Sequence, residues 1–222
     1  SIVAYTGTGT DNDGVAHGLN AAPSFVISKK RSGTGAWVVK TCADKIFSSN
    51  DTHLRLDDTA VLSGSNSTGD NTTSTNGATA TTFNVGSWSG VNEDDGTFIA
   101  YCFAPKQGFS AFGSFEGNSS TNGPFIYTGF KPAMILYKNA DYLENWHIQS
   151  WKQETANPNN NQLTPNENYA ESSDSNTNVD FLSNGFKMRS SHRTSNYTGN
   201  TFVYMAFAEA PFVNSNGVPC NA

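Results

Sequence analysis

The sequence has few charged residues, few cysteines and no long hydrophobic run, and each shortage argues against a class of protein. Charged residues make up 14% of the 222 residues, and acidic residues outnumber basic ones by 19 to 13. The resulting net charge of −6 disfavours nucleic acid as a partner, because a surface that binds nucleic acid needs positive charge. The longest apolar stretches, FIAYCFA and MILY, are far shorter than the ~20 residues of a membrane span. Membrane insertion is therefore not expected.

The cysteines and histidines do not form a recognisable reactive motif. Cys42, Cys102 and Cys220 are an odd and sparse set without a CxxC pair, so they predict no disulfide framework. Cys102 lies inside an apolar phrase and is expected to be a small core residue. The four histidines show neither HExxH nor the spacing of a metal pair. We therefore expect no cofactor and no catalytic residue.

Two acidic turns are the remaining candidates for chemistry. Asp11-Asn12-Asp13-Gly14 begins like a calcium loop, but the glutamate that should close such a loop is replaced by Ala22. Glu93-Asp94-Asp95-Gly96 is a second acidic turn just before an apolar phrase. Both turns are expected to be solvated hairpin turns rather than metal sites. Calcium binding and a carboxylate pair for glycoside hydrolysis stay open, because the separation of two carboxylates is a three-dimensional quantity.

Gly, Ser, Thr and Asn take the place of the missing charges, as in TTSTNGATATT and NPNNN. These residues favour turns and strand surfaces over helix interiors. Aromatic residues at 12% argue against disorder, because a disordered chain lacks such apolar side chains. The composition therefore predicts an all-β protein.

The chain repeats one phrase, TFIAYCFA at 97–104 and TFVYMAFA at 201–208. Other matches occur in the same order, and SIVAYTG at the start resembles AFGSFEG at 111–117. The matching pairs are Gly18 with Gly129, Pro23 with Pro132, Lys29 with Lys138, and Trp37 with Trp146. This order predicts an internal duplication, with a first copy at 1–110 and a second copy plus a C-terminal tail at 111–222.

Within each copy the pattern is that of strands separated by turn residues. The phrase TFIAYCFA is apolar on both alternating faces, which favours a central strand of a β-sandwich-like half. Long polar segments lie at matching places in the two copies, at 48–80 and roughly 152–178. Loops of this length are usually functional or mobile, so we expect them to make contacts with partners.

The tryptophans are the candidates for a ligand site. Trp88, in GSWSG, and Trp151 have no counterpart in the other copy, and either could stack on a sugar. Ordinary packing is the alternative for both. Trp37 and Trp146 occur at matching positions and are expected to pack in the cores.

The motifs together resemble a domain of virion proteins from tailed bacteriophages, notably those of marine cyanobacteria. The resemblance runs from Tyr5 to about Pro219 and is most specific in two stretches, GF-x-P-A-x-x-L-x-K and Y-x-AFAE-x-PF. Such domains often lie at the C-terminal end of tail-fibre or other appendage proteins. The resemblance supplies no catalytic residue for this chain.

The resemblance implies a structural or adhesive role in the virion, on the tail or the capsid surface, and no enzymatic activity. The expected partners are other virion proteins, further copies of the chain with a trimer favoured, and a host-surface polysaccharide. The alternatives are an extracellular lectin or carbohydrate-binding module and, third, a polysaccharide-degrading enzyme.

Overall fold

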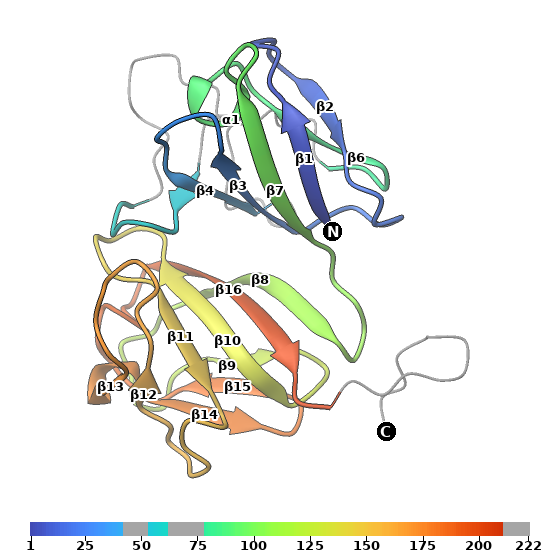
Figure 1. The fold of residues 1–222 in the computed structure, drawn as a ribbon. Coiled ribbons are helices and arrows are strands. Elements are labelled where there is room, and N and C mark those ends of the chain that lie inside the picture. The colour runs from blue at the N-terminus through green and yellow to red at the C-terminus, as the bar shows by residue number, and fades with distance from the viewer. Residues whose placement is uncertain (42–52, 62–77, 211–222) are drawn as a thin grey trace. The chain divides into compact units, whose positions relative to one another are not determined.

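The computed structural model describes residues 1–41, 53–61 and 78–210, and these residues form an essentially all-β protein (Figure 1). The predicted fold class is thus confirmed. The helical elements of these ranges are α1 (Ser89–Asn92) and the 3-10 turn η1 (Ser175–Thr177). In the same ranges no helix is long and apolar enough to cross a membrane. The chain divides into two compact units, Ser1–Ala104 and Pro105–Ala222, called unit 1 and unit 2 below.

Unit 1 contains a five-stranded antiparallel sheet and a two-stranded sheet. The larger sheet has the order β1-β7-β3-β4-β5, and β2 pairs with β6. The strands are β1 (Ile2–Thr6), β2 (Asp13–Ala16), β3 (Phe25–Lys30), β4 (Trp37–Thr41), β5 (Leu54–Arg55), β6 (Thr82–Val85) and β7 (Thr97–Phe103).

Both sheets of unit 1 contribute side chains to one core. Val15, Phe83 and Val85 come from the small sheet, and they join a cluster of buried residues from β3, β4 and β7. Cys102 belongs to this cluster and is 1% exposed, as the sequence predicted. Cys42 and Cys220 lie outside the described residues.

Unit 2 contains a four-stranded antiparallel sheet of order β11-β10-β16-β8, a three-stranded sheet of order β14-β15-β9, and the pair β12-β13. Its core includes Ile135, Tyr137 and Phe202 from the larger sheet and Val179 and Phe186 from the smaller one. The strands are β8 (Ser110–Glu116), β9 (Phe125–Tyr127), β10 (Pro132–Asn139), β11 (His147–Ser150), β12 (Asn161–Gln162), β13 (Ser172–Ser173), β14 (Val179–Leu182), β15 (Gly185–Met188) and β16 (Thr201–Ala208).

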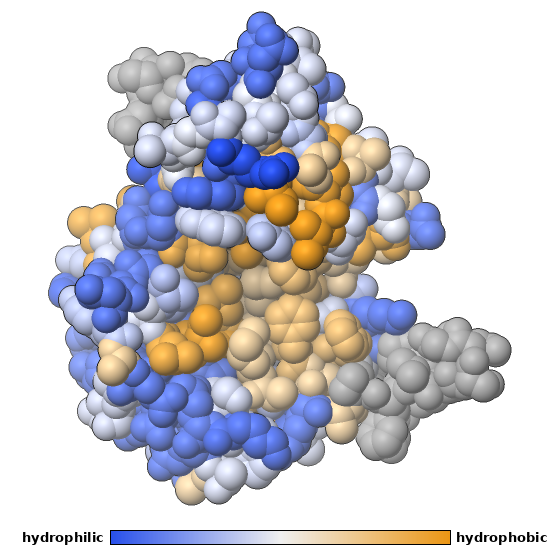
Figure 2. Space-filling model, in the orientation of Figure 1, coloured by the Kyte–Doolittle hydropathy of each residue, from blue (hydrophilic) through white to orange (hydrophobic). Residues whose placement is uncertain are grey.

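The repeated phrases form central strands, β7 between β1 and β3, and β16 between β10 and β8. A hydrophobic row crosses the face of the larger sheet of unit 2 that points away from the core of that unit, with Met205 opposite both Leu136 and Phe112; Leu136 and Met205 are buried. Figure 2 shows hydrophobic residues over the part of unit 2 where β10, β16 and β8 lie. The apolar character of both faces of the phrase follows from this central place in the sheet.

The two units have the same strand order, since β1-β7-β3-β4 corresponds in chain order to β8-β16-β10-β11. Lys29 lies opposite Ile99 of β7, and Lys138 lies opposite Val203 of β16. Ring stacking matches as well. The rings of Tyr5 and Phe98 stack with centroids 5.1 Å apart, and those of Phe115 and Phe202 stack with centroids 5.0 Å apart.

The backbone of each matched tryptophan is held in the same way. The Trp37 amide donates to Oδ1 of Asp57 at 3.0 Å, and the Trp146 amide donates to Oδ1 of Asn166 at 2.9 Å. In both units the acceptor lies 20 residues after the tryptophan. These hydrogen bonds join the start of the fourth strand of each unit to the segment that follows it.

In each unit, a buried asparagine links two segments that are far apart in the sequence. In unit 1, Oδ1 of Asn92 accepts a hydrogen bond from the Thr8 amide (2.9 Å) and its Nδ2 donates to the Thr10 carbonyl (2.8 Å). In unit 2, Oδ1 of Asn196 accepts from the Asn118 amide and its Nδ2 donates to the Ser120 carbonyl, both at 2.8 Å. We call these arrangements the Asn92 link and the Asn196 link.

A glycine lets the backbones approach at each link. A Cβ atom on Gly7 would lie 2.2 Å from the Glu93 carbonyl oxygen, and one on Gly117 would lie 2.1 Å from the Tyr197 carbonyl oxygen. Real Cβ atoms do not come so close, so only glycine fits either position. The steric requirement is thus the same in both units.

The two long polar segments differ in what the structure describes. Most of 48–80 lies outside the described residues. The segment 152–178 contains β12, β13 and η1, so it has more regular structure than its composition predicts. Within it, the side chain of Asn159 is fully buried and donates to the carbonyls of Ser150 and Glu154, which ties the segment to the end of β11.

Candidate functional site

Trp88, the first candidate for sugar binding, is half-buried just before α1 in unit 1. A Cβ atom on Gly90 would lie 2.5 Å from its six-membered ring, so the indole covers that glycine. The His53 ring lies beside it, with a centroid separation of 5.1 Å. Trp88 also packs against the core cluster of unit 1. These contacts cover much of the surface of the Trp88 indole.

Trp151, the second candidate, is held by charged side chains in unit 2. The Nζ atom of Lys131 lies 3.3 Å from the ring centroid, and that of Lys152 lies 5.0 Å from it. The indole Nε1 donates to Oε1 of Glu209 at 2.5 Å. Glu209 also pairs with both lysines, and the hydrogen bond from Lys131 is the main cause that lowers the pKa of its carboxyl group. The side chains of Trp151, Lys131, Lys152 and Glu209 thus form one cluster of mutual contacts at the end of β16.

Trp88 and Trp151 belong to different units, and each has its own set of neighbours within its unit. Trp146 is fully buried, which confirms its expected core position. Trp37 is only half-buried, and its ring centroid lies 6.1 Å from that of Tyr101.

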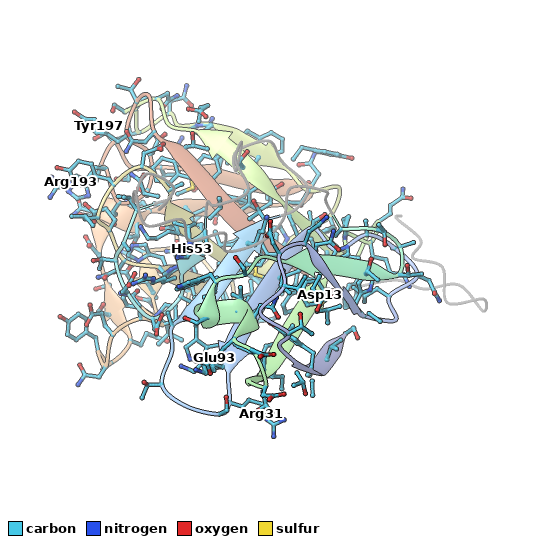
Figure 3. The ribbon with its side chains drawn as sticks, turned by 90° about the horizontal axis from the view of Figure 1, so that it is seen from above. Asp13, Arg31, His53, Glu93, Arg193 and Tyr197 are labelled. Atoms are coloured by element: carbon cyan, nitrogen blue, oxygen red, sulfur yellow. The ribbon has the colours of Figure 1, made fainter. Side chains whose placement is uncertain are left out.

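The acidic turns have partners of their own. Oδ2 of Asp13 accepts from the Thr8 hydroxyl at 2.8 Å, and Glu93 pairs with Lys30 at 2.6 Å. Figure 3 shows Glu93 and Arg31 at the same end of unit 1. Among the residues that the structure describes, no group of three or more His, Cys, Asp and Glu could hold a metal ion.

A polar cluster that the sequence did not reveal lies inside unit 2. His147 is 4% exposed, and its Nε2 lies 3.0 Å from the Thr194 hydroxyl oxygen. Burial lowers the pKa of His147 to about 4 and raises that of Tyr137, whose ring lies beside it, so both are neutral at pH 7. The Tyr137 hydroxyl and both side-chain polar atoms of Gln149 have no hydrogen-bond partner among the described residues. Such atoms are places for internal water.

The exposed hydrophobic side chains are distributed unevenly between the units. In the described part of unit 1, Ile2 is the one large hydrophobic side chain that is exposed. The described part of unit 2 exposes eight, six of them aromatic rings on loops or on β9. The eight are Phe109, Phe125, Tyr127, Tyr142, Leu143, Leu163, Tyr169 and Tyr197.

The Tyr142 ring is held in place by an arginine that is itself paired with a glutamate. The Arg193 guanidinium lies 4.7 Å from the centre of the Tyr142 ring, and its Nε donates to Oε1 of Glu144 at 2.6 Å. Tyr197 comes from the same segment as Arg193, and Figure 3 places both at the periphery. The rings are therefore presented to solvent on loops that charged contacts and the Asn196 link hold in place.

The chain matches a protein family, described as Domain of unknown function (DUF7483), over residues 1–211, and it belongs to that family. No curated protein and no solved structure matches it.

Proposed function

We propose that the chain is a structural protein of a bacteriophage virion, in a tail-fibre, other appendage or capsid-surface module, that takes part in assembly or in attachment to host-surface glycans. The sequence resemblance to virion domains supports this role. The matching strand orders, ring stacks and asparagine links support the idea that the two units arose by duplication. A rigid repeated β-unit suits a protein that must stay folded outside the cell.

The observation that carries the attachment part is the uneven distribution of exposed rings. Tyr127, Tyr142, Tyr169 and Tyr197 are each 44–67% exposed, and all belong to unit 2. Exposed tyrosines among polar residues are typical of recognition surfaces, because the ring is apolar while the hydroxyl group can donate a hydrogen bond. We assign contact with the target to unit 2 and a mainly structural role to unit 1.

The virion setting explains why weak contacts would suffice. Several copies of one chain on a particle engage a polymeric surface together, so that the overall affinity exceeds that of each contact. A homotrimer would present three copies of unit 2 about one axis. Trp88 and Trp151 stay candidates for additional contacts, each through the part of its ring that its neighbours leave exposed.

An adsorption assay tests the attachment part. The purified chain, added to host cells before particles that carry it, should slow adsorption in proportion to its concentration, because it occupies the same surface glycans. A chain mutated at Tyr142 and Tyr197 to alanine should compete less well. Unchanged adsorption at saturating concentrations of the chain would limit its role to assembly.

A lectin or carbohydrate-binding module that acts outside any virion is the second candidate, favoured by the same exposed tyrosines. It differs in its setting, because such a protein would bind sugar as an isolated chain and would be absent from purified particles.

A further inference from the structure

The outer face of the three-stranded sheet in unit 2 carries two exposed aromatic rings on one strand. Phe125 is 44% exposed and Tyr127 is 67% exposed, while Ile126 between them is 5% exposed and belongs to the core. Alternate residues of a strand point to opposite faces, so both rings are on the outer face, about 7 Å apart along β9.

The neighbouring strand leaves room for these rings. Gly185 lies opposite Tyr127, and a Cβ atom on it would lie 3.0 Å from Cε2 and Cζ of Phe125. The Phe125 ring therefore leans over the glycine. The Phe125 ring thus lies over the neighbouring strand and presents its surface to solvent.

Charged side chains border the rings. Lys187 lies opposite Phe125 on one side and opposite Asp180 on the other. The Asp180 carboxylate is paired with Nε of Arg189 at 3.3 Å. The side chain of Lys187 makes no ion pair or hydrogen bond among the residues that the structure describes, so its ammonium group is available to a ligand.

In the described part of unit 1, the outer face of the small sheet β2-β6 carries no aromatic ring. This sheet pairs Gly14 with Asn84 and Ala16 with Thr82 on the outer face, while Val15 and Phe83 lie in the core. The fold thus forms without exposed rings at this place. Stability of the sheet does not account for Phe125 and Tyr127.

We propose that Phe125, Tyr127 and Lys187 form a binding site for an acidic polysaccharide. The two rings stack on the apolar faces of successive sugar units, and the Lys187 ammonium group binds a carboxylate or another acidic substituent. This inference deepens the attachment part of the proposed function and depends on it.

The size of the face favours a sugar chain over a protein partner. Three strands spaced 4.8 Å apart, with three residues on β9, give a face of about 10 Å by 10 Å. A stable protein interface buries roughly 800 Å² on each partner, which is several times this area. A few sugar rings fit on it.

The test measures binding of the full chain by isothermal titration calorimetry, with oligogalacturonate as the acidic probe and cello-oligosaccharides as the neutral probe. Tyr127→Ala should weaken binding of the acidic probe tenfold or more, and Tyr127→Phe should retain most of it. Lys187→Gln should weaken binding of the acidic probe and leave binding of the neutral probe unchanged. Ile2→Ala, which changes an equally exposed side chain of unit 1, should have no effect.

Three results would overturn the inference. The first is that neither probe binds. The second is that Tyr127→Ala binds the acidic probe as well as the wild type does, when both have the same melting temperature. The third is that Tyr127→Ala converts a dimer to a monomer in analytical ultracentrifugation. Preference for the neutral probe would overturn the assignment of Lys187. If the chain is found on particles but binds neither probe, this site is wrong and the virion role stands.

Discussion

Replacing Asn196 with alanine removes one side chain that holds three parts of unit 2 together. Its Oδ1 accepts from the Asn118 amide, and its Nδ2 lies 2.8 Å from the carbonyl oxygens of both Ser120 and Ser190. The residue is fully buried, so water does not replace these bonds without a rearrangement of the loops. Three hydrogen bonds at a net 0.5–1.5 kcal/mol each give an expected loss of about 3 kcal/mol in unfolding free energy.

The matched variant in unit 1 is Asn92→Ala. The Asn92 link contains two side-chain hydrogen bonds, to the Thr8 amide and the Thr10 carbonyl, so we expect a loss of about 2 kcal/mol. Hydrogen exchange followed by mass spectrometry is the suitable assay, because it reports opening free energies peptide by peptide. Each variant should increase exchange in the peptides of its own unit.

Asn196→Asp separates hydrogen bonding from packing. Aspartate has nearly the same volume, but its second oxygen would face the carbonyls of Ser120 and Ser190 in place of a donor. It should therefore destabilise unit 2 at least as much as alanine does. A small effect of Asn196→Asp, together with a large effect of Asn196→Ala, would refute the reasoning, because volume alone would then explain the loss.

Phe98→Ala and Phe202→Ala should each cost on the order of 3–5 kcal/mol in a denaturant titration, because both rings are fully buried in their cores. A loss below about 1 kcal/mol in either variant would contradict that burial. His147 makes stability depend on pH: the unfolded chain gains a proton near pH 6.5, whereas the folded chain gains it only near pH 4. The unfolding free energy should thus be full above pH 6.5 and fall by about 3 kcal/mol towards pH 4. His147→Gln should remove that part of the pH profile, and an unchanged profile would show that His147 titrates normally. Alanine at Trp88 or Trp151 should weaken binding to host cell envelopes in a pull-down while leaving the fold intact, and equal binding would exclude these rings as contacts.

The sequence predicted the strands best where burial and repetition coincide. TFIAYCFA was predicted to be a central strand because both of its faces are apolar, and TFVYMAFA was matched to it as the repeated phrase. The two phrases form β7 and β16. The pairing of Lys29 with Lys138 agrees with the register of the two sheets, since each lysine lies opposite a corresponding residue of the phrase. Local hydrophobic patterns are sufficient for such predictions.

The asparagine links were missed although the sequence contains a signal for them. Asn92 and Asn196 each lie five residues before the threonine that begins the repeated phrase. In a chain so rich in asparagine this spacing does not stand out. The importance of either residue comes from its burial against a distant loop, which no local pattern encodes.

The candidate sites were the least predictable part. Trp151 was singled out because it has no counterpart in the other copy. Lys152 follows it directly, but Lys131 and Glu209, which complete its surroundings, lie far along the chain. Phe125 and Tyr127 form too short an alternation to indicate a strand, and their exposure depends on how β9 pairs with β15. Both sites depend on contacts between distant segments.

Locating the chain in purified phage particles tests the central claim most directly. Mass spectrometry would give the copy number, and cryo-electron microscopy would give the position. We predict a few copies at the tail, in multiples of three or six, or many copies over the capsid surface. Absence of the chain from every particle would contradict the virion role.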